Sequence, residues 1–164
     1  FDMEATVERI VGELKSNLSE RGNSGIFWED KEGESHAKPY TSGPEIQIID
    51  NEGHPDAKVR PNFHQAGALY DMVQPTKDVS KPAGEWNHVL LTIDHNKNEG
   101  SVELNGTKIV EFPLRGEEWD SLVFNSKFND DCNYKYFGKM KSGKIGLQDH
   151  GNEVSFRNIK IREL

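Results

Sequence analysis

The chain has 164 residues, of which 34% are apolar and 29% charged, so it is long enough to bury a core, and we expect a single domain over residues 1–164. Its net charge of −8 and the lack of a Lys/Arg cluster argue against nucleic acid as a partner. The single cysteine, Cys132, excludes an intrachain disulfide and a Cys/His zinc spacing, and no apolar run reaches transmembrane length.

Alternation of apolar and polar residues with a period of two is the main signal along the chain. It predicts strands, in chain order, at 2–11, 24–29, 45–49, 66–73, 86–94, 101–104, 107–112, 144–148 and 154–161. Long loops are expected at 12–23, 30–43, 50–65, 74–85 and 113–143, the last with a short helical turn at 117–122. The expected number of strands is about ten or more, and with almost no helix this predicts an all-β sandwich or jelly roll of two antiparallel sheets.

The segment 86–112 carries the clearest strand pattern. Apolar residues at every second position from Val89 to Ile93 share one face, as in a half-buried antiparallel strand. Asn105-Gly106 then separates two further alternating runs, and this pair is the strongest short signal for a hairpin. A three-stranded meander is therefore expected here.

Four segments are unusually polar for strand positions or strand ends: 43–50, 62–70, 126–128 and 148–151. In the first of them Ile46 and Ile48 are expected to face the core, so that Glu45 and Gln47 point together to the opposite face. Taken singly, most of these polar residues are explained equally well as solvent-side or turn residues. Glu45 and His150 are the strongest candidates for chemistry.

Eight short runs, in order along the chain, resemble the 3-keto-disaccharide hydrolase domain family. They are 23–27, 45–50, 67–70, 81–87, 104–106, 126–128, 143–151 and 156–161. The most specific part is the ending, Leu-Gln-Asp-His-Gly at 147–151 followed by Phe-Arg-Asn-Ile at 156–159. The resemblance spans residues 23–164. Family members usually open with a Leu-Phe-Asp-Gly-like strand and a Trp, which are missing here, so the first edge strand is expected to be missing or atypical.

This resemblance implies a concanavalin A-like jelly roll with a concave face that binds its ligand. It implies a bacterial enzyme that acts on an oligosaccharide or a 3-keto-glycoside, a sugar already oxidised at carbon 3. Family members are typically exported, and many are lipoproteins, so a periplasmic or extracellular location is expected, with a lipid anchor in the precursor. Phe1 opens directly into strand-like sequence, which indicates a processed or trimmed chain.

A ketone at carbon 3 acidifies the hydrogen on carbon 2, so cleavage by elimination and hydration needs a base, a group that faces the enolate and an acid. Among the positions that the resemblance selects, residue type makes Glu45 or His150 the base and Lys127 the group that faces the enolate. The candidate substrate-binding residues are Gln47, Tyr70, Gln148, Asp149 and Ser24. No cofactor is indicated with certainty, and Glu45, His54 and His64 are the candidate ligands of a divalent metal ion.

A conventional glucanase is one alternative on the same fold. Jelly-roll glucanases carry Glu-x-Asp-x-x-Glu on a strand, whereas this chain has Glu45-x-Gln47-x-x-Asp50. The central carboxylate is replaced by an amide and the last one is shorter, which disfavours an ordinary retaining mechanism.

A non-catalytic carbohydrate-binding module is the second alternative. Such modules stack sugars on planar aromatics, for which Trp28, Trp86 and Trp119 are available, although core packing is the more frequent use of at least two of them. A binding module does not need Glu45, Lys127 and His150 to converge. Their convergence in one pocket would favour the enzyme.

Overall fold

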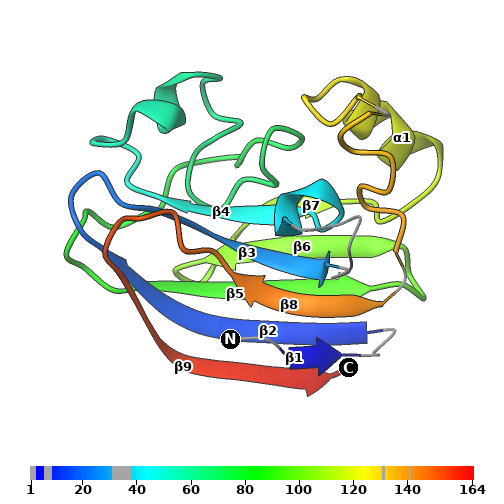
Figure 1. Cartoon of the computed structure of the whole chain (residues 1–164). Helices are drawn as coiled ribbons and strands as arrows, with labels where there is room; N and C mark the ends of the chain where they lie inside the picture. The colour runs from blue at the N-terminus through cyan, green and yellow to red at the C-terminus, as the bar shows by residue number, and fades with distance from the viewer. Residues whose placement is uncertain (1–2, 6–8, 31–37, 131, 141) are drawn as a thin grey trace.

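The computed structural model describes residues 3–5, 9–30, 38–130, 132–140 and 142–164, with side chains from residue 16 onward. In this part of the chain, nine strands form two antiparallel sheets, one of four strands and one of five, that pack as two layers (Figure 1). The all-β sandwich of two antiparallel sheets that the sequence predicts is confirmed.

The four-stranded sheet has the order β1-β8-β3-β4. Its strands are β1 (Met3–Ala5), β8 (Gly143–Leu147), β3 (Asn23–Asp30) and β4 (Glu45–Ile49). Even-numbered residues of β3 and β4, such as Ile26 and Ile48, join the core. The odd-numbered residues therefore point to the outer face of this sheet, as predicted for the strand at 45–49.

The five-stranded sheet has the order β7-β6-β5-β2-β9. Its strands are β7 (Thr107–Phe112), β6 (Glu99–Leu104), β5 (Asn87–Asp94), β2 (Arg9–Leu18) and β9 (Val154–Glu163). The first three are consecutive in the chain and antiparallel neighbours, so the predicted meander is confirmed.

The turn between β6 and β7 has the geometry that its sequence predicts. Asn105 and Gly106 have φ angles of 51° and 79°, and two positive values are what a type I′ hairpin turn requires. The Asn105 amide also donates to the backbone oxygen of Val79 at 2.8 Å. The hairpin is thereby fixed to the long connection that precedes β5.

The loop predicted at 12–23 is wrong for residues 12–18, because β2 continues to Leu18 between β5 and β9. Pairing with β5 is unbroken from Arg9 to Ser16, and neighbours on both sides supply the backbone hydrogen bonds that the weak local pattern does not signal. The strand predicted at 2–11 is divided between β1 and β2, and its residues 2 and 6–8 lie outside the described residues.

The strand predicted at 66–73 is also wrong. This segment is a series of turns with isolated bridges at Leu69, because Gly67 and Asp71 have positive φ angles of 81° and 61° that interrupt an extended chain. Its backbone nevertheless follows the free edge of β4: the N–H of Gln47 donates to the oxygen of Ala68 at 3.0 Å. The segment therefore extends the four-stranded sheet without being a strand.

The space between the sheets is filled by apolar side chains from both layers, among them Ile46 and Leu69 on one side and Val102 and Ile109 on the other. Two of the three tryptophans belong to this core. They are Trp28 and Trp119, which are buried and therefore do not form a sugar-stacking surface.

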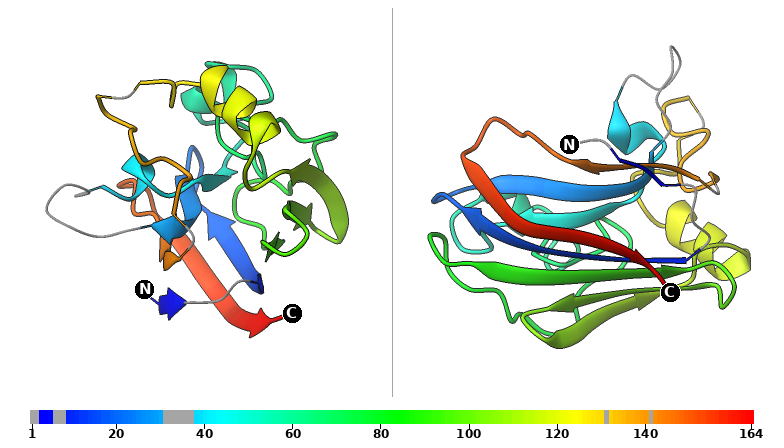
Figure 2. Two further views of the ribbon diagram at one scale, coloured as in Figure 1. Left: turned by 90° about the vertical axis from the view of Figure 1, so that its right-hand side faces the viewer. Right: turned by 90° about the horizontal axis from the view of Figure 1, so that it is seen from below.

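Two long connections lie beyond the sheets (Figures 1 and 2). The one after β4 contains the 3-10 helix η2 (Pro55–Lys58), and the one after β7 contains α1 (Glu117–Phe124), where a helical turn is predicted. A second 3-10 helix, η1 (Pro39–Thr41), precedes β4. In Figure 1, η2 and α1 stand near opposite ends of β4, so the two connections flank the outer face of the four-stranded sheet.

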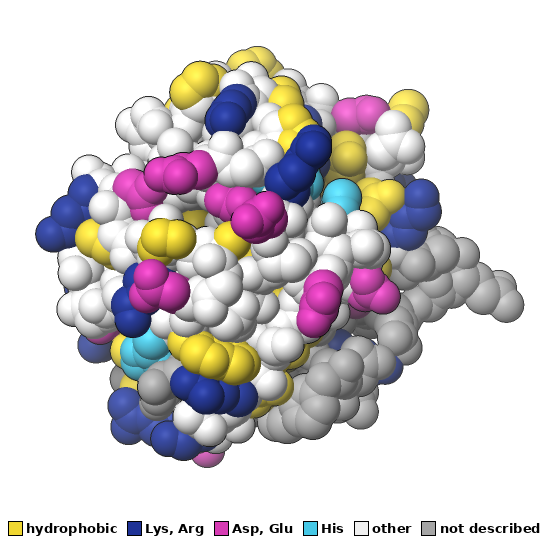
Figure 3. Space-filling model, turned by 90° about the vertical axis from the view of Figure 1, so that its left-hand side faces the viewer, with side chains coloured by type: hydrophobic (Ala, Val, Ile, Leu, Met, Phe, Trp, Pro, Cys, Tyr) yellow, Lys and Arg dark blue, Asp and Glu magenta, His cyan; other side chains and the backbone are white. Residues whose placement is uncertain are grey.

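The surface carries charges of both signs. On the face shown in Figure 3, acidic and basic side chains are interspersed with uncharged polar groups over most of the area, and several Lys and Arg side chains lie close together at the lower left. Among the described residues, no helix has the length and apolar character needed to cross a membrane.

Candidate functional site

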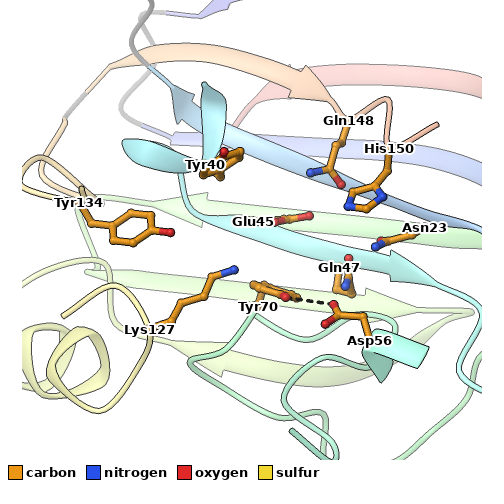
Figure 4. Close-up of a pocket in the computed structure, with 10 residues that line it drawn as sticks. All are labelled: Asn23, Tyr40, Glu45, Gln47, Asp56, Tyr70, Lys127, Tyr134, Gln148 and His150. Carbon is orange, nitrogen blue, oxygen red and sulfur yellow. Dashed lines mark hydrogen bonds between the residues drawn. The ribbon is translucent and has the colours of Figure 1, made fainter. Parts of the chain in front are cut away.

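A polar cavity of about 300 Å³ lies on the outer face of the four-stranded sheet (Figure 4). Strands β3 and β4 contribute its floor, and the connections on either side contribute its walls. The residues that line it are Asn23, Tyr40, Glu45, Gln47, Asp56, Tyr70, Lys127, Tyr134, Gln148 and His150. All three predicted catalytic residues, Glu45, Lys127 and His150, are therefore brought together in one cavity.

The floor follows from the register of β3 and β4. Gly25 pairs with Gln47, and residues two positions apart on a strand share a face, so Asn23, Glu45 and Gln47 all point outward. Gln47 is 2% exposed and Asn23 4% exposed, because the surrounding loops cover this part of the sheet. The alternation that predicts Glu45 and Gln47 applies equally to Asn23, which is not among the predicted site residues.

Tyr70 is held against β4 by the irregular segment that follows Gly67. The N–H of Tyr70 donates to the backbone oxygen of Glu45 at 2.9 Å, so these two residues are neighbours. The Tyr70 hydroxyl donates to Asp56 Oδ2 at 3.0 Å, and burial followed by the Asp56 charge raises the pKa of Tyr70 (Figure 4). Tyr70 is therefore a hydrogen-bond donor fixed in the cavity wall.

A buried histidine supports this wall from behind. The His64 ring stacks on Tyr70 with 4.2 Å between ring centres. Its Nδ1 lies 3.1 Å from Asp56 Oδ1, and its Nε2 lies 2.9 Å from Asp71 Oδ1. Because both ring nitrogens are engaged by carboxylates, His64 holds Asp56 and Tyr70 in place and does not itself face the cavity.

Asp71 links the buried His64 to the backbone of Lys127. Its Oδ2 accepts from the backbone N–H of Lys127 at 2.6 Å, and its Oδ1 is 2.8 Å from Arg60 Nη1. The Lys127 ammonium lies 4.1 Å from the centre of the Tyr70 ring, within cation–π range. Burial lowers the pKa of Lys127, while Glu45 and Asp71 act in the opposite direction.

Glu45 is the buried acid of the site. Its side chain is at the middle of the cavity in Figure 4, and the residue is only 8% exposed. Burial raises the pKa of Glu45 to about 8, although the nearby Lys127 charge works against the rise. No hydrogen bond to its carboxyl group is present among the described residues, so the group is available to a bound molecule.

Gln148 and His150 enter the cavity from the segment after β8. The N–H of Gln148 donates to the oxygen of Gly25 at 2.9 Å, and Ser24 Oγ donates to the oxygen of Gln148 at 2.8 Å. Ser24 is fully buried and does not line the cavity, so it holds the Gln148 backbone instead of touching a ligand.

Two further predicted residues lie at the margin of the site. Asp149 does not line the cavity; its Oδ1 accepts from the N–H of Gly151 at 2.9 Å and stabilises the turn. His54 is also outside the lining, and its ring meets the edge of the His150 ring with 6.3 Å between centres.

The described residues contain no group of three or more His, Cys, Asp and Glu side chains placed to hold a metal ion. Glu45, His54 and His64 are accordingly not gathered into the ligand set that the sequence suggests. His64 is turned to two carboxylates, and His54 Nδ1 accepts from the N–H of Asp56 at 3.1 Å.

Two amide oxygens at the cavity floor are unpaired. Asn23 Oδ1 and Gln47 Oε1 are buried and have no hydrogen-bond partner among the described residues. A buried unpaired polar atom costs about 1–3 kcal/mol, which the fold retains only where it serves something else. Their shared position in this cavity points to a polar ligand.

A second hollow, of about 430 Å³, lies among the turns around Arg21, Asp50 and Asp78. The carboxylates of Asp50 and Asp78 in this hollow are already engaged by hydrogen bonds. Burial raises the pKa of Asp50, but backbone N–H donors from Arg21, Gly53 and Glu52 outweigh this and leave it below its usual range. The carboxylates of Asp50 and Asp78 are therefore less available to a ligand than that of Glu45.

Four cavity residues have no counterpart among the sequence predictions: Asn23, Tyr40, Asp56 and Tyr134. Tyr40, Asp56 and Tyr134 lie in the connections between strands. There the sequence has no alternating pattern to indicate which way a side chain points. Figure 4 shows Tyr40 and Tyr134 at the end of the cavity nearer Lys127, and Asn23 and His150 at the other end. The cavity thus has an aromatic end and an amide–imidazole end.

Comparison with known proteins gives a consistent result. A family model described as the 3-keto-alpha-glucoside-1,2-lyase-like domain matches residues 3–162. A protein of Bacteroides thetaiotaomicron named 3-keto-disaccharide hydrolase is 36% identical over 93% of this chain, and the chain spans 57% of that relative's length.

Solved structures agree on the fold. A Parabacteroides distasonis protein, assigned by its name to the glycosyl hydrolases, superposes with a TM-score of 0.86 and 27% identity, over 96% of this chain and 71% of that one. A carbohydrate-binding module from Bacillus subtilis superposes with a TM-score of 0.54 over 99% of this chain and 78% of that module. At 9% identity, the second likeness concerns the fold alone.

Proposed function

This chain belongs to the 3-keto-alpha-glucoside-1,2-lyase-like domain family, and on that premise we propose that it cleaves 3-keto-glycosides, including 3-keto-disaccharides. One observation carries the proposal: the buried Glu45 carboxyl, with its pKa raised to about 8, shares a polar cavity with the Lys127 ammonium. A carboxyl that titrates near neutral pH is suited to proton transfer at carbon, and a fixed ammonium is suited to a developing oxyanion.

The rest of the cavity suits a sugar. The side chains of Asn23, Gln47 and Gln148 present amide donors and acceptors, the groups that pair with hydroxyls. Tyr40 and Tyr134 add aromatic faces at one end, against which the apolar face of a sugar ring packs. These features support a carbohydrate ligand bound along the outer face of β3 and β4.

In the first step, Glu45 takes the proton from carbon 2 of the oxidised sugar. The electron pair of that C–H bond moves toward carbon 3, and Lys127 stabilises the negative charge on the carbon-3 oxygen. The enolate then collapses: a double bond forms between carbons 1 and 2, the bond from carbon 1 to the glycosidic oxygen breaks, and His150 donates a proton to the departing oxygen.

In the second step, water adds across the new double bond. His150, now neutral at the nitrogen that gave its proton, takes a proton from the water as its oxygen bonds to carbon 1. Glu45 then protonates carbon 2. The sum is hydrolysis of one glycosidic bond, with both side chains restored to their starting states and no oxidant consumed.

The same assignment predicts the pH dependence of the reaction. Because Glu45 must be deprotonated to act as the base, kcat/KM should rise with pH through a midpoint near 8. Because Lys127 and His150 must both carry their protons, kcat/KM should fall again at higher pH. Burial lowers the pKa of Lys127, so the part of this fall that is due to Lys127 should come at a pH below the ordinary lysine value of 10.5. A falling limb near pH 8 that disappears in Glu45→Gln would make Glu45 the acid and reverse its role with His150.

The direct test is incubation of the purified protein with a panel of 3-keto-glycosides and with the matching unoxidised glycosides. We expect sugar to be released from the 3-keto-glycosides alone, and chromatography detects the released sugar. The unoxidised glycosides lack the ketone that acidifies carbon 2, so the elimination has no route for them. Solvent deuterium incorporated at carbon 2 of the released sugar would support proton abstraction there.

Two outcomes would overturn the proposal. Cleavage of the unoxidised set would indicate a conventional glycosidase, although Asp50, the second carboxylate of the glucanase-like pattern, does not line the cavity. Binding of either set without turnover would make the domain a carbohydrate-binding module.

A further inference from the structure

Gly25 lies beneath the Glu45 side chain at the centre of β3. A Cβ atom built on Gly25 would stand 2.0 Å from Glu45 Oε1, 2.7 Å from its Cδ and 2.8 Å from its Cγ. Real Cβ atoms do not approach other heavy atoms so closely. All three nearest neighbours belong to the one side chain, so any side chain at position 25 would occupy the space that the Glu45 carboxyl fills.

The backbone does not explain why this position is a glycine. Gly25 is absent from the residues with positive φ, and its strand pairing with Gln47 is regular. An L-residue can adopt this conformation, and a strand interior generally disfavours glycine. The glycine is therefore explained by the Glu45 carboxyl, which occupies the space that a side chain at position 25 would need.

We propose that Gly25 is a positioning residue, which makes room on the sheet for the Glu45 carboxyl and so fixes that carboxyl at the floor of the cavity. The proposal deepens the proposed function, since it rests on Glu45 being the group that moves the proton. The proposal concerns where the Glu45 carboxyl lies, and this can be tested without any substrate.

The consequence of filling this space follows from the neighbours of Glu45. Its chain is flexible, so an added methyl group at position 25 would displace the carboxyl toward the cavity without disturbing the backbone. There the carboxyl would be better hydrated, and the pKa that burial raises would fall toward its ordinary value. The distance from the carboxyl to a bound sugar would change by an ångström or so, which costs about 10²-fold in rate where geometry is critical.

Strand β8 supplies a matched control. Gly146 lies in the neighbouring strand, opposite Phe27, and also has an ordinary φ. A Cβ built on Gly146 meets only the Cβ of Phe27, at 4.0 Å, which is an ordinary contact. Gly146→Ala therefore makes the same chemical change in the same sheet without entering the space of Glu45.

The experiment compares the wild type, Gly25→Ala and Gly146→Ala by two readouts. The first is the titration of the Glu45 carboxyl carbon by NMR, assigned by its loss in Glu45→Gln. The second is kcat/KM for a 3-keto-glycoside. We expect Gly25→Ala to lower the Glu45 midpoint and to reduce kcat/KM about 10²-fold, while Gly146→Ala leaves both within about twofold of wild type.

A Gly25→Ala protein with the wild-type Glu45 midpoint and rate would overturn the proposal. If Gly25→Ala fails to fold, the same substitution is made in a Glu45→Ala background, where the contact is gone. Recovery of folding there supports the proposal, and continued failure overturns it. If no variant, including the wild type, cleaves 3-keto-glycosides, the proposed function fails while the titration still decides the role of Gly25.

Discussion

Glu45→Gln is expected to lower kcat/KM for 3-keto-glycosides by about 10²- to 10⁴-fold, the range that a positioned general base contributes. Glutamine keeps the shape of the protonated acid and cannot accept a proton from carbon 2. The measurement is steady-state kinetics at about pH 8, where the wild-type carboxyl is half ionised. The rising limb near pH 8 should disappear in the variant, because the group that produces it is gone.

Glu85→Gln provides the control for this substitution. Glu85 is exposed in the connection before β5 and is not part of the cavity, so its variant should retain wild-type rates. Retention of wild-type activity and of the pH 8 limb in Glu45→Gln would contradict the role given to Glu45. The limb would then belong to another group in the cavity.

The pH dependence of the free energy of unfolding is a second test of Glu45→Gln. The pKa of Glu45 rises from an ordinary value of 4.5 to about 8 on folding, so folding favours its protonated form. That stabilisation is fully present below about 4.5 and is lost as the pH rises through about 8. Relative to wild type, Glu45→Gln should gain up to about 1.4 kcal/mol in free energy of unfolding per pH unit across this window.

The alternation of apolar and polar residues predicts only the part of the site that lies on strands. The period of two orients Glu45 and Gln47 from their own neighbours alone, because Ile46 and Ile48 need the core. Lys127 and His150 lie outside the strands and are indicated only by residue type and family resemblance, and both line the same cavity as Glu45.

The remainder of the site depends on contacts between distant segments. Asp56 lies in the cavity lining, where it accepts a hydrogen bond from Tyr70, fourteen positions later. His64 looks like a free metal ligand in the sequence, yet two carboxylates from either side of it occupy its ring. Local patterns carry no information about such partners, so the sequence does not indicate that carboxylates engage both ring nitrogens of His64.

The two errors in the strands have a common physical origin. In β2, pairing on both sides overrides a weakly patterned sequence, whereas at 66–73 positive φ angles at Gly67 and Asp71 interrupt a well patterned one. In both cases the outcome is decided by tertiary hydrogen bonds. The second error matters for function, since the irregular segment is what carries Tyr70 and Asp71 to the cavity wall.

Asp71 is the residue on which that wall depends most. It is 5% exposed and accepts from the Lys127 backbone, His64 and Arg60. Burial raises its pKa, but these donors outweigh burial and leave the pKa below the usual 3.8. Its contribution to stability is accordingly present above about pH 3.8 and lost as the pH falls through the lowered value.

Asp71→Ala is expected to reduce the free energy of unfolding by about 3–5 kcal/mol near neutral pH, because it leaves buried donors without an acceptor. Asp71→Asn keeps one acceptor oxygen and tolerates the positive φ at this position. It should therefore lose less free energy of unfolding than Asp71→Ala. Asp78→Ala is the matched control, since Asp78 also accepts several hydrogen bonds but is exposed, and should lose no more than about 1 kcal/mol. Urea unfolding at several pH values measures the free energy of unfolding of all three variants.

Equal losses for Asp71→Ala and Asp78→Ala would contradict this prediction. They would show that the buried hydrogen bonds of Asp71 to His64 and Lys127 do not hold the cavity wall, and that Lys127 is positioned by its own loop.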